Sequence, residues 1–423
     1  MANVTEVAAK ASGNGATAAA GREARHWARA KSIPKGLTGD GAAAEAMRQI
    51  DPDVVAAYPI TPQTEIVERF AEFVADGSVT TEFVAVESEH SALSACCGAA
   101  ASGARAMTCT ASQGLALMHE ILYIAAGQRL PIVMPVVNRA LSAPINIHGD
   151  HSDTMGSRDC GWIQLNCHDA QEVYDSAIQA IRIAEDPDVL LPVMITFDGF
   201  QVSHDMERVE ALPDDMVKEF IGSYHAAVNL LDAKNPQNLG WLAGVPYYFE
   251  HRVNATRALT RSLDTIEDVD RQFGELSGRS YGLIETHLIE DAEIVLVAMA
   301  TGAGTARAAV DQARERGIKA GSVRIRAFRP FPVAQIVNAL RKAKVVAVLD
   351  RAESPGASGA PAFSDIRTAL YDEPVRPQVV SYVYGLGGRD LTVKMVSAVL
   401  DDLAEAVKSG KAPSARGYLG LRE

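Results

Sequence analysis

The stretch TEFVAVESEHSALSACCGAAASGARAMTCTASQGLALM, residues 81–118, decides the fold because it contains two junctions between an apolar strand and a helix. Residues 79–86 are predicted to form a buried strand that ends at residues 87–89, Glu-Ser-Glu, where a helix rich in Ala, Ser, Cys and Gly begins. The next predicted strand, 106–111, ends at residues 112–114, Ser-Gln-Gly, before another helix. In open α/β sheets, ligands bind in the crevice outside the carboxyl ends of the strands. The two junctions therefore predict a binding site at one edge of a parallel sheet.

Two carboxylates, Glu87 and Glu89, are the candidates for chemistry at this edge. Acidic residues are also common in the first turn of a helix, where they stabilise the positive end of the helix dipole. The local pattern by itself leaves both interpretations open for each residue.

The composition is that of an ordinary globular chain. Its 423 residues are enough for two or three domains, and 48% of them are hydrophobic. The net charge of −13 argues against a nucleic-acid partner, because phosphate recognition needs a basic surface. No run approaches the roughly 18 apolar residues that a membrane span requires. Residues 1–34 are interpreted as an N-terminal arm, and they lack the apolar block of a secretory signal.

Five cysteines occur, an odd number without a Cys-x-x-Cys pair: Cys96, Cys97, Cys109, Cys160 and Cys167. This spacing does not suit a zinc site or an iron–sulfur cluster held by this chain. We interpret the thiols as small buried side chains, as expected for a protein of the reducing cytoplasm.

Thr61 lies between Pro59 and Pro62, at the carboxyl end of the strand predicted at residues 53–58. A residue that precedes a proline is disfavoured in the helical region, so the backbone around Thr61 is restricted. Its side chain is therefore a candidate for the site. The alternative is a helix that simply begins with Pro62 at its first position.

The preceding helix begins near residues 38–41, Thr-Gly-Asp-Gly, and Asp40 is its predicted N-cap. A Gly-Asp-Gly triplet also opens the magnesium diphosphate motif of thiamine enzymes. That motif requires asparagine further along, and residues 63–77 contain none. We therefore predict no metal ligands from this triplet.

Arg139 ends the strand predicted at residues 130–137, on the same side of the sheet as Thr61 and Glu89. A guanidinium at this position can bind a carboxylate through two parallel hydrogen bonds. An ordinary surface arginine is the alternative.

The polar loop at residues 144–160 contains His148, Asp150, His151 and Asp153. These residue types bind metals, but here they lack the helical i, i+4 pairing typical of such sites. We predict no metal site in this loop.

Apolar strands that alternate with helices indicate an α/β fold with two parallel sheets, each covered by helices on both faces. The first domain is predicted at residues 35–200 and the second at 290–423. A connecting segment, 201–289, lacks the alternation. In the second domain, residues 301–304 are predicted as a turn and residues 322–328 as one strand. The two glycines of this turn lack the third glycine of a dinucleotide-binding motif.

Several short runs, taken together and in this order, resemble the α subunit of the 2-oxoacid:acceptor oxidoreductases, the family of pyruvate:ferredoxin oxidoreductase. The resemblance extends over about residues 35–400. The runs are YPITPQT (58–64), VESEHS (86–91), TASQG (110–114), NRA (138–140), GDHSD (149–153), FDGF (197–200), RPFP (329–332) and GLGGRD (385–390).

This resemblance implies a fold and a site. The first domain would be a pyrimidine-binding thiamine domain and the second a transketolase C-terminal-like domain. Glu89 would be the catalytic carboxylate that hydrogen-bonds the aminopyrimidine of thiamine diphosphate, with Thr61 beside the cofactor and the substrate. Arg139 would pair with the carboxylate of the 2-oxoacid. In the family, a separate β subunit holds the diphosphate and Mg²⁺, which accounts for the missing magnesium motif.

The resemblance also implies a reaction and its partners. A 2-oxoacid is decarboxylated, its acyl group passes to coenzyme A, and electrons pass through [4Fe-4S] clusters to ferredoxin or NAD. The clusters belong to partner subunits, so we expect a γ subunit and a ferredoxin-like iron–sulfur subunit in a dimer of heteromers. Pyruvate is the expected substrate, and phenylglyoxylate, indolepyruvate and 2-oxoisovalerate are the alternatives.

Two other readings of the sequence remain open. The chain could be a structural subunit without a catalytic role, although it retains Glu89, Thr61 and Arg139 together. It could also belong to the lipoamide-linked thiamine dehydrogenases, which share the two-domain plan. The runs YPITP and GLGGRD favour the ferredoxin-type family.

Overall fold

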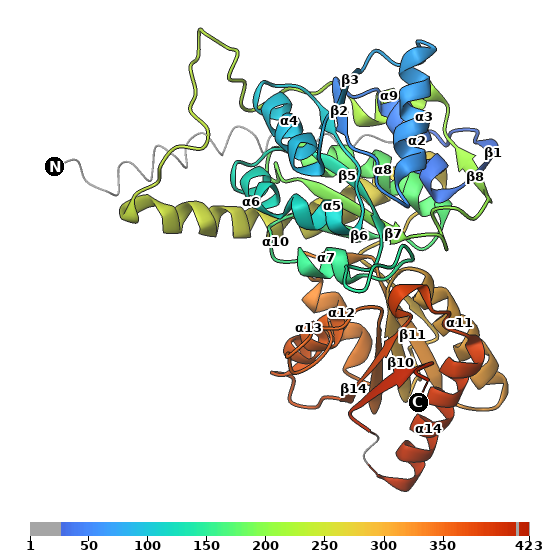
Figure 1. Ribbon diagram of the computed structural model, residues 1–423. Helices are drawn as coiled ribbons and strands as arrows, with labels where there is room; N and C mark the ends of the chain where they lie inside the picture. The colour runs from blue at the N-terminus through green and yellow to red at the C-terminus, as the bar shows by residue number, and fades with distance from the viewer. Residues whose placement is uncertain (1–26, 412–413, 423) are drawn as a thin grey trace.

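The computed structural model describes residues 27–411 and 414–422, which form two α/β units, drawn one above the other in Figure 1. Most of the predicted N-terminal arm, residues 1–26, lies outside the described residues. Within the described ranges, none of the helices combines the length and apolar character needed to cross a membrane.

The first unit contains a seven-stranded sheet in the order β12-β6-β7-β5-β4-β2-β3. All neighbouring strands are parallel except β12, which runs antiparallel to β6. The strands are β2 (Val54–Ala57), β3 (Glu82–Ala85), β4 (Ala106–Met107), β5 (Val133–Asn138), β6 (Ile163–Asn166), β7 (Val193–Asp198) and β12 (Ala327–Arg329).

Helices cover both faces of this sheet, and each face has its own hydrophobic core. One face packs against α2 (Gly39–Ile50), α3 (Thr64–Ala75) and α8 (Ala170–Glu185). The other packs against α4 (Glu89–Ala101), α5 (Ser112–Leu117) and α6 (His119–Gly127). The short helix α7 (Ser152–Gly156) lies at the end of the sheet nearest the second unit (Figure 1).

The second unit contains a six-stranded sheet in the order β15-β14-β13-β10-β11-β9, parallel except for the edge strand β9. Its strands are β9 (Ile284–His287), β10 (Ile294–Ala298), β11 (Ala320–Ile325), β13 (Val345–Asp350), β14 (Gln378–Tyr384) and β15 (Arg416–Leu419). Its helices are α11 (Ala300–Glu315), α12 (Val333–Leu340), α13 (Pro361–Leu370) and α14 (Val393–Ser409). The predicted α/β class with two mainly parallel sheets is therefore confirmed.

The predicted connecting segment, residues 201–289, contains regular structure. Strand β8 (Glu207–Ala211) pairs with β1 (Ile33–Leu37), and α9 (Asp214–Ile221) follows. The 33-residue helix α10 (Val245–Ser277) packs its second half on the first unit, and its first half projects away from the body (Figure 1).

Four local predictions were wrong. Strand β3 is shorter than predicted and only partly buried, because it is the edge strand of its sheet. The N-cap of α2 is Thr38, whose hydroxyl accepts from Gly41 N, while Asp40 lies inside the first turn. Residues 301–304 belong to α11 and form no separate turn. The loop at residues 144–160 contains α7.

The predicted strand at residues 322–328 is in fact two strands in two sheets. Strand β11 ends at Ile325, and β12 begins at Ala327 and pairs with β6 of the first unit. The side chain of Arg326 between them is fully buried and donates to Ser176 and Gln179 of α8. One extended run therefore joins the two units.

Candidate active site

Glu89 is the first residue of α4, and residues 86–88 connect it to the end of β3. Ser88 caps this helix, and its hydroxyl accepts a hydrogen bond of 3.3 Å from Ser91 N. The Glu89 side chain is only 7% exposed. Its carboxylate accepts no hydrogen bond from any described residue. With no hydrogen-bond partner among the described residues, this carboxylate is available to a ligand, which helix capping does not explain.

The absence of a side chain at Gly114 leaves space for the Glu89 carboxylate. A Cβ atom at this position would lie 2.8 Å from Glu89 Oε1 and would also collide with the Thr110 hydroxyl. Gly114 belongs to α5, which follows the second strand of the opening stretch. The two strand-to-helix junctions therefore meet at Glu89, as the sequence predicted.

Glu87 has a different environment from Glu89. It is exposed, and its carboxylate accepts a hydrogen bond from the Ser91 hydroxyl, which holds the pKa of Glu87 below its usual range. This residue fits the helix-terminus interpretation that the sequence left open. The buried carboxylate is that of Glu89.

Arg139 and Thr61 lie in contact. Arg139 is 6% exposed, and its Nη1 donates to the Thr61 carbonyl at 2.8 Å. Its other nitrogens face the Asn146 carbonyl at 3.2 Å and Gln113 Oε1 at 3.5 Å. Burial lowers the pKa of Arg139, and Asp153 opposes that shift. An ordinary surface arginine is excluded by this burial.

The arginine retains an unneutralised charge. Its guanidinium contacts only neutral oxygens, and no ion pair with a described carboxylate is formed. Thr61 is exposed, and its hydroxyl forms no hydrogen bond with the described residues. Because Gln113 is the neighbour of Gly114, the Arg139–Thr61 pair and Glu89 lie around the same junction.

Asp153 positions both strand ends and was not identified as a site residue from the sequence. Its Oδ2 accepts from the backbone N–H groups of Ser112 and Arg139, each at 3.0 Å. Asn138 and Thr154 donate to its other oxygen. Burial raises the pKa of Asp153 to about 6, against the effect of these hydrogen bonds. In the sequence Asp153 is only one of several polar residues in a loop.

The other polar residues of that loop contact the second unit. Asp150 Oδ2 accepts from Gly387 N at 3.0 Å, and Asn146 Nδ2 donates to the Gly387 carbonyl at 2.9 Å. The GLGGRD run therefore packs against the loop that also contacts Arg139.

A second group of buried charges joins the two units, and we call it the junction network. Asp198, at the end of β7, accepts from His151 Nε2 at 2.8 Å and lies 3.0 Å from Arg351 Nη1. Thr301 N donates to its other oxygen at 3.1 Å. All of these contacts are buried or half-buried.

A separate set of buried charges, along α8, also joins the two units. Glu172 pairs with Arg324 of β11 at 2.7 Å and with Arg326 at 3.2 Å. His168 Nδ1 lies 2.6 Å from the Glu172 carboxylate. The junction network, taken as both sets, comprises Asp198 and Glu172 with their partners.

Comparison with known proteins gives matches over both units. The family model described as "Pyruvate flavodoxin/ferredoxin oxidoreductase, thiamine diP-bdg" matches residues 45–271. The model described as "Pyruvate:ferredoxin oxidoreductase core domain II" matches residues 292–396.

Similar full-length proteins carry subunit names. "Pyruvate synthase subunit PorA" of Thermotoga maritima is 53% identical over 387 residues, 92% of this chain and 98% of that protein. The protein of the same name from Pyrococcus furiosus is 45% identical, with the same coverage of both chains. "Ketoisovalerate oxidoreductase subunit VorA" of Pyrococcus horikoshii is 44% identical over 90% of this chain and 96% of its own length.

Two solved structures share the fold. The 2-oxoglutarate:ferredoxin oxidoreductase from Magnetococcus marinus has a TM-score of 0.69 and 18% identity over 89% of this chain and 66% of its own. A split gene transketolase has a TM-score of 0.53 and 14% identity over 88% of this chain and 99% of its own. The resemblance that the short motifs predicted is therefore confirmed along the sequence. One family model matches residues 45–271 of 423, and relatives of 53% and 45% identity cover 92% of the chain. The chain therefore belongs to the thiamine diphosphate-binding pyruvate flavodoxin/ferredoxin oxidoreductase family.

Proposed function

We propose that this chain is the α subunit of a complex that oxidatively decarboxylates pyruvate to an acyl-CoA and CO₂ and passes the electrons to ferredoxin. Relatives named pyruvate synthase subunit, at 53% and 45% identity, support this substrate and a multisubunit assembly. The observation that carries the proposal is the meeting of Glu89, Thr61 and Arg139 around one junction.

The site fits the aminopyrimidine end of thiamine diphosphate. Glu89 offers a buried carboxyl without a partner, and Gly114 leaves the space above it free of a side chain. When bound, thiamine diphosphate supplies a carbon nucleophile for the 2-oxoacid. Glu89 would share a proton with the pyrimidine ring nitrogen and hold that ring in place. Thr61 lies on the same edge and would contact the cofactor and the substrate.

Arg139 would bind the carboxylate of the substrate. Its guanidinium donates to the carbonyl oxygens of Thr61 and Asn146, so its charge is not neutralised by a protein carboxylate. A planar guanidinium positions a carboxylate through two hydrogen bonds, which orients the adjacent oxo carbon. The exposed Thr61 hydroxyl is a donor for the oxo-acid end.

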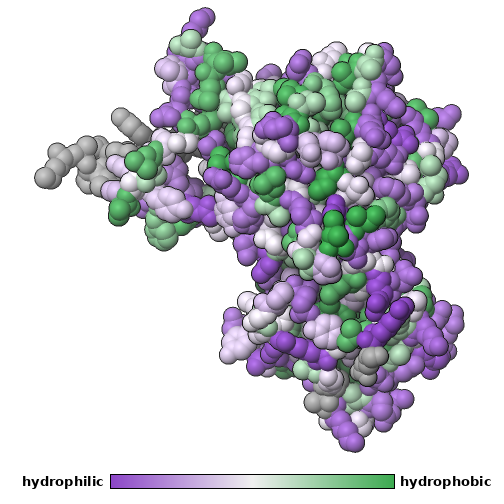
Figure 2. Space-filling view, viewed as in Figure 1, coloured by the Kyte–Doolittle hydropathy of each residue, from purple (hydrophilic) through white to green (hydrophobic). Residues whose placement is uncertain are grey.

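The remaining chemistry would require partner subunits. A β subunit would hold the diphosphate and Mg²⁺, while γ and ferredoxin-like subunits would supply [4Fe-4S] clusters and a surface for coenzyme A. An exposed apolar segment, residues 230–249, comprises part of the loop before α10 and the start of that helix. It projects from the body in Figure 2 and supports such contacts. Its large hydrophobic residues are Leu230, Leu231, Trp241, Leu242, Val245, Tyr247, Tyr248 and Phe249.

The test uses the complex purified anaerobically through a tag on this chain. Viologen reduction with coenzyme A is measured for pyruvate, 2-oxoisovalerate, 2-oxoglutarate, phenylglyoxylate and indolepyruvate. We expect pyruvate to give the highest kcat/KM, and Glu89→Gln to lower that rate by at least about 100-fold, as loss of a general acid–base group does. Glu87→Gln, two residues away and exposed, is the matched control and should retain full rate.

Each part of the proposal has its own contradicting result. Preference for 2-oxoisovalerate would assign the chain to the ketoisovalerate relatives, which are 44% identical. Full activity of an assembled Glu89→Gln complex would leave the chain a structural role only. Lack of oxidation of every 2-oxoacid by a thiamine- and cluster-loaded complex would refute the reaction.

A further inference from the structure

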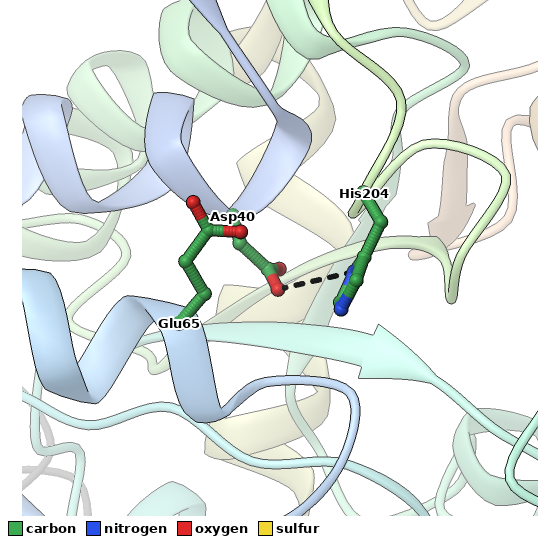
Figure 3. Close-up of side chains that lie close together, drawn as sticks. All are labelled: Asp40, Glu65 and His204. Carbon is green, nitrogen blue, oxygen red and sulfur yellow. Dashed lines mark ion pairs between the residues drawn. The ribbon is translucent and has the colours of Figure 1, made fainter.

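Three potential metal ligands from distant parts of the chain lie together beside α2. Asp40 is in the first turn of α2, Glu65 in the first turn of α3, and His204 in the turn after β7. Figure 3 shows the two carboxylates and the imidazole facing one another. One ligand atom from each lies within 4.8 Å of the others.

Asp40 is the unusual member of this cluster. It is 0% exposed, and both of its carboxylate oxygens lack a hydrogen-bond partner among the described residues. Burial raises the pKa of Asp40 well above its usual range, and the charge of Glu65 adds to the effect. The buried Asp153 and Asp198, in contrast, each accept several hydrogen bonds. A buried carboxyl aimed at two other ligands and satisfied by neither calls for a missing partner.

Glu65 retains coordinating capacity. Its Oε1 accepts from Arg69 Nε at 2.6 Å, and its Oε2 has only the Thr38 hydroxyl, at 3.2 Å. Arg69 offsets the charge of Glu65, and Asp40 forms no ion pair with a lysine or arginine among the described residues. The cluster is therefore attractive to a positive ion.

His204 gives the cluster access to solvent. Its side chain is 41% exposed, and its Nδ1 lies 3.7 Å from Asp40 Oδ2. The Ser203 hydroxyl, 2.7 Å from the same nitrogen, holds the ring beside Asp40. A metal-bound imidazole commonly has an oxygen partner on its other ring nitrogen, so an ion bound at Nε2 would leave the Nδ1–Ser203 contact in place. An ion can enter from the exposed side.

We propose that Asp40, Glu65 and His204 bind one divalent transition-metal cation, with water completing its coordination. Two carboxylates and one imidazole form a mixed donor set that suits Mn²⁺ or Zn²⁺. The ion joins the starts of α2 and α3 to the turn after β7. Because Glu65 lies four residues after Thr61, the ion also fixes the segment that carries Thr61.

No local sequence pattern indicated this site. The three ligands are far apart along the chain and follow no metal-binding spacing, and we predicted no metal ligands from the Gly-Asp-Gly triplet. The fold brings them together through backbone hydrogen bonds from Gly39 N to the Val202 carbonyl and from Asp40 N to the Ser203 carbonyl.

The experiment is a titration of the full chain, freed of metal by a chelator, with MnCl₂. Free Mn²⁺ is followed by its electron paramagnetic resonance signal, and ZnCl₂ is then added as a competitor. We expect one saturable Mn²⁺ site per chain, displaced by Zn²⁺. Asp40→Asn and His204→Gln should each weaken binding by at least about 100-fold, since loss of even an outer-shell partner costs 10- to 100-fold. Glu68→Gln, an exposed acid on α3, is the control and should bind as the wild type does.

Two results would overturn the site. One is no saturable binding of Mn²⁺ or Zn²⁺ by the folded wild-type chain, which would leave Asp40 a protonated, neutral buried acid. The other is unchanged binding in both ligand variants, which would place the ion elsewhere. The His204 side chain is 41% exposed, so its variant tests the site even where the Asp40 variant folds poorly. Circular dichroism of each variant establishes that the chain is folded.

Discussion

Glu89 and Asp198 occupy comparable positions with opposite surroundings. Asp198 is the last residue of β7 and Glu89 lies four residues after the end of β3 in the same sheet, and they are 0% and 7% exposed. Glu89 accepts no hydrogen bond from the described residues, whereas Asp198 is bonded by His151, Thr301 and Arg351. Burial opposes the ionisation of Asp198, but Arg351 and His151 outweigh it, so the pKa of Asp198 lies well below its usual range.

The comparison teaches that burial at a strand end does not decide the role of a carboxylate. What decides it is the set of partners that the rest of the chain supplies. A carboxylate whose hydrogen bonds are all satisfied inside the protein is part of the fold, because its removal leaves buried partners unpaired. One that is buried beside a glycine and left unpaired is available to a ligand. The predictions below test the two environments against each other.

The largest effect is expected for Asp198→Ala, which breaks the junction network. The substitution leaves the guanidinium of Arg351, 2% exposed, without its carboxylate. Removing one partner of a buried ion pair costs about 3–5 kcal/mol. The free energy of unfolding, measured by urea denaturation, should fall by that amount. Asp205→Ala, an exposed acid nearby, should change it by less than about 0.5 kcal/mol.

If Asp198→Ala lowers the free energy of unfolding by less than about 1 kcal/mol, the partners of a buried carboxylate do not decide its role. The same assay on Glu89→Gln gives the complementary test. That variant should leave the free energy of unfolding nearly unchanged, because no described group loses a hydrogen-bond partner.

The second prediction concerns Gly114→Ala, which closes the space at Glu89. The new methyl would meet Glu89 Oε1 at 2.8 Å and the Thr110 hydroxyl, so the carboxylate must move. Displacement of a catalytic group by about 1 Å can cost on the order of 100-fold in rate. Viologen reduction by the purified complex should fall by about that factor. Gly98→Ala, on the same helix as Glu89 but with open space around it, should retain full activity.

Retention of full activity in Gly114→Ala would mean that Glu89 works from another position than the one described here. The Gly98 control separates this result from a general effect of adding a methyl group to these helices.

The third prediction concerns Arg139→Lys. Lysine keeps the charge but loses the fork that contacts the Thr61 and Asn146 carbonyls and would hold a substrate carboxylate. We expect KM for the 2-oxoacid to rise about 10-fold, with a smaller change in kcat, since the interaction is made in the ground state as well. Steady-state kinetics of the complex measure both. Arg208→Lys, an exposed side chain on β8, should alter neither constant. An unchanged KM in Arg139→Lys would remove Arg139 from the substrate site.

Of the two environments, only that of Glu89 could be predicted from the sequence. Polar residues after apolar strands predicted the Glu89 junction, and Arg139 was predicted to end a strand on the same side. These features are local, because strand ends and helix starts depend on neighbouring residues. The pairing of Arg139 with the Thr61 carbonyl, 78 positions away, fits that prediction.

The junction network could not be predicted in the same way. Two of the partners of Asp198, His151 and Thr301, lie 47 and 103 positions away along the chain. Glu172 and its partner Arg324 are separated by 152 positions. Only packing of the two units determines which charges meet. For the same reason, the local sequence could not show that residues 322–328 are divided between β11 and β12, because β12 is defined by its pairing with β6.

The smallest effect is expected from pH, through His168 at the edge of the junction network. Burial lowers the pKa of His168, but Asp169 and Glu172 outweigh it and raise the value to about 9. Since the folded-state pKa lies above the unfolded value of about 6.5, the stabilisation is complete below pH ~6.5 and is lost as pH rises toward 9. The side chain is 32% exposed, so solvent screening limits the effect to about 1 kcal/mol.

Urea denaturation at several pH values from 6 to 9.5 measures this loss. In His168→Gln the decline across the window should be smaller by about 1 kcal/mol, because glutamine does not titrate. Burial raises the pKa of Cys96, Cys97 and Cys160 to about 12, so these thiols do not contribute in the same range. An equal decline in both proteins would mean that the His168–Glu172 pair adds nothing to the junction network. The buried pairs of Asp198 and Glu172 with arginine would then hold the two units together without it, since arginine does not titrate in this window.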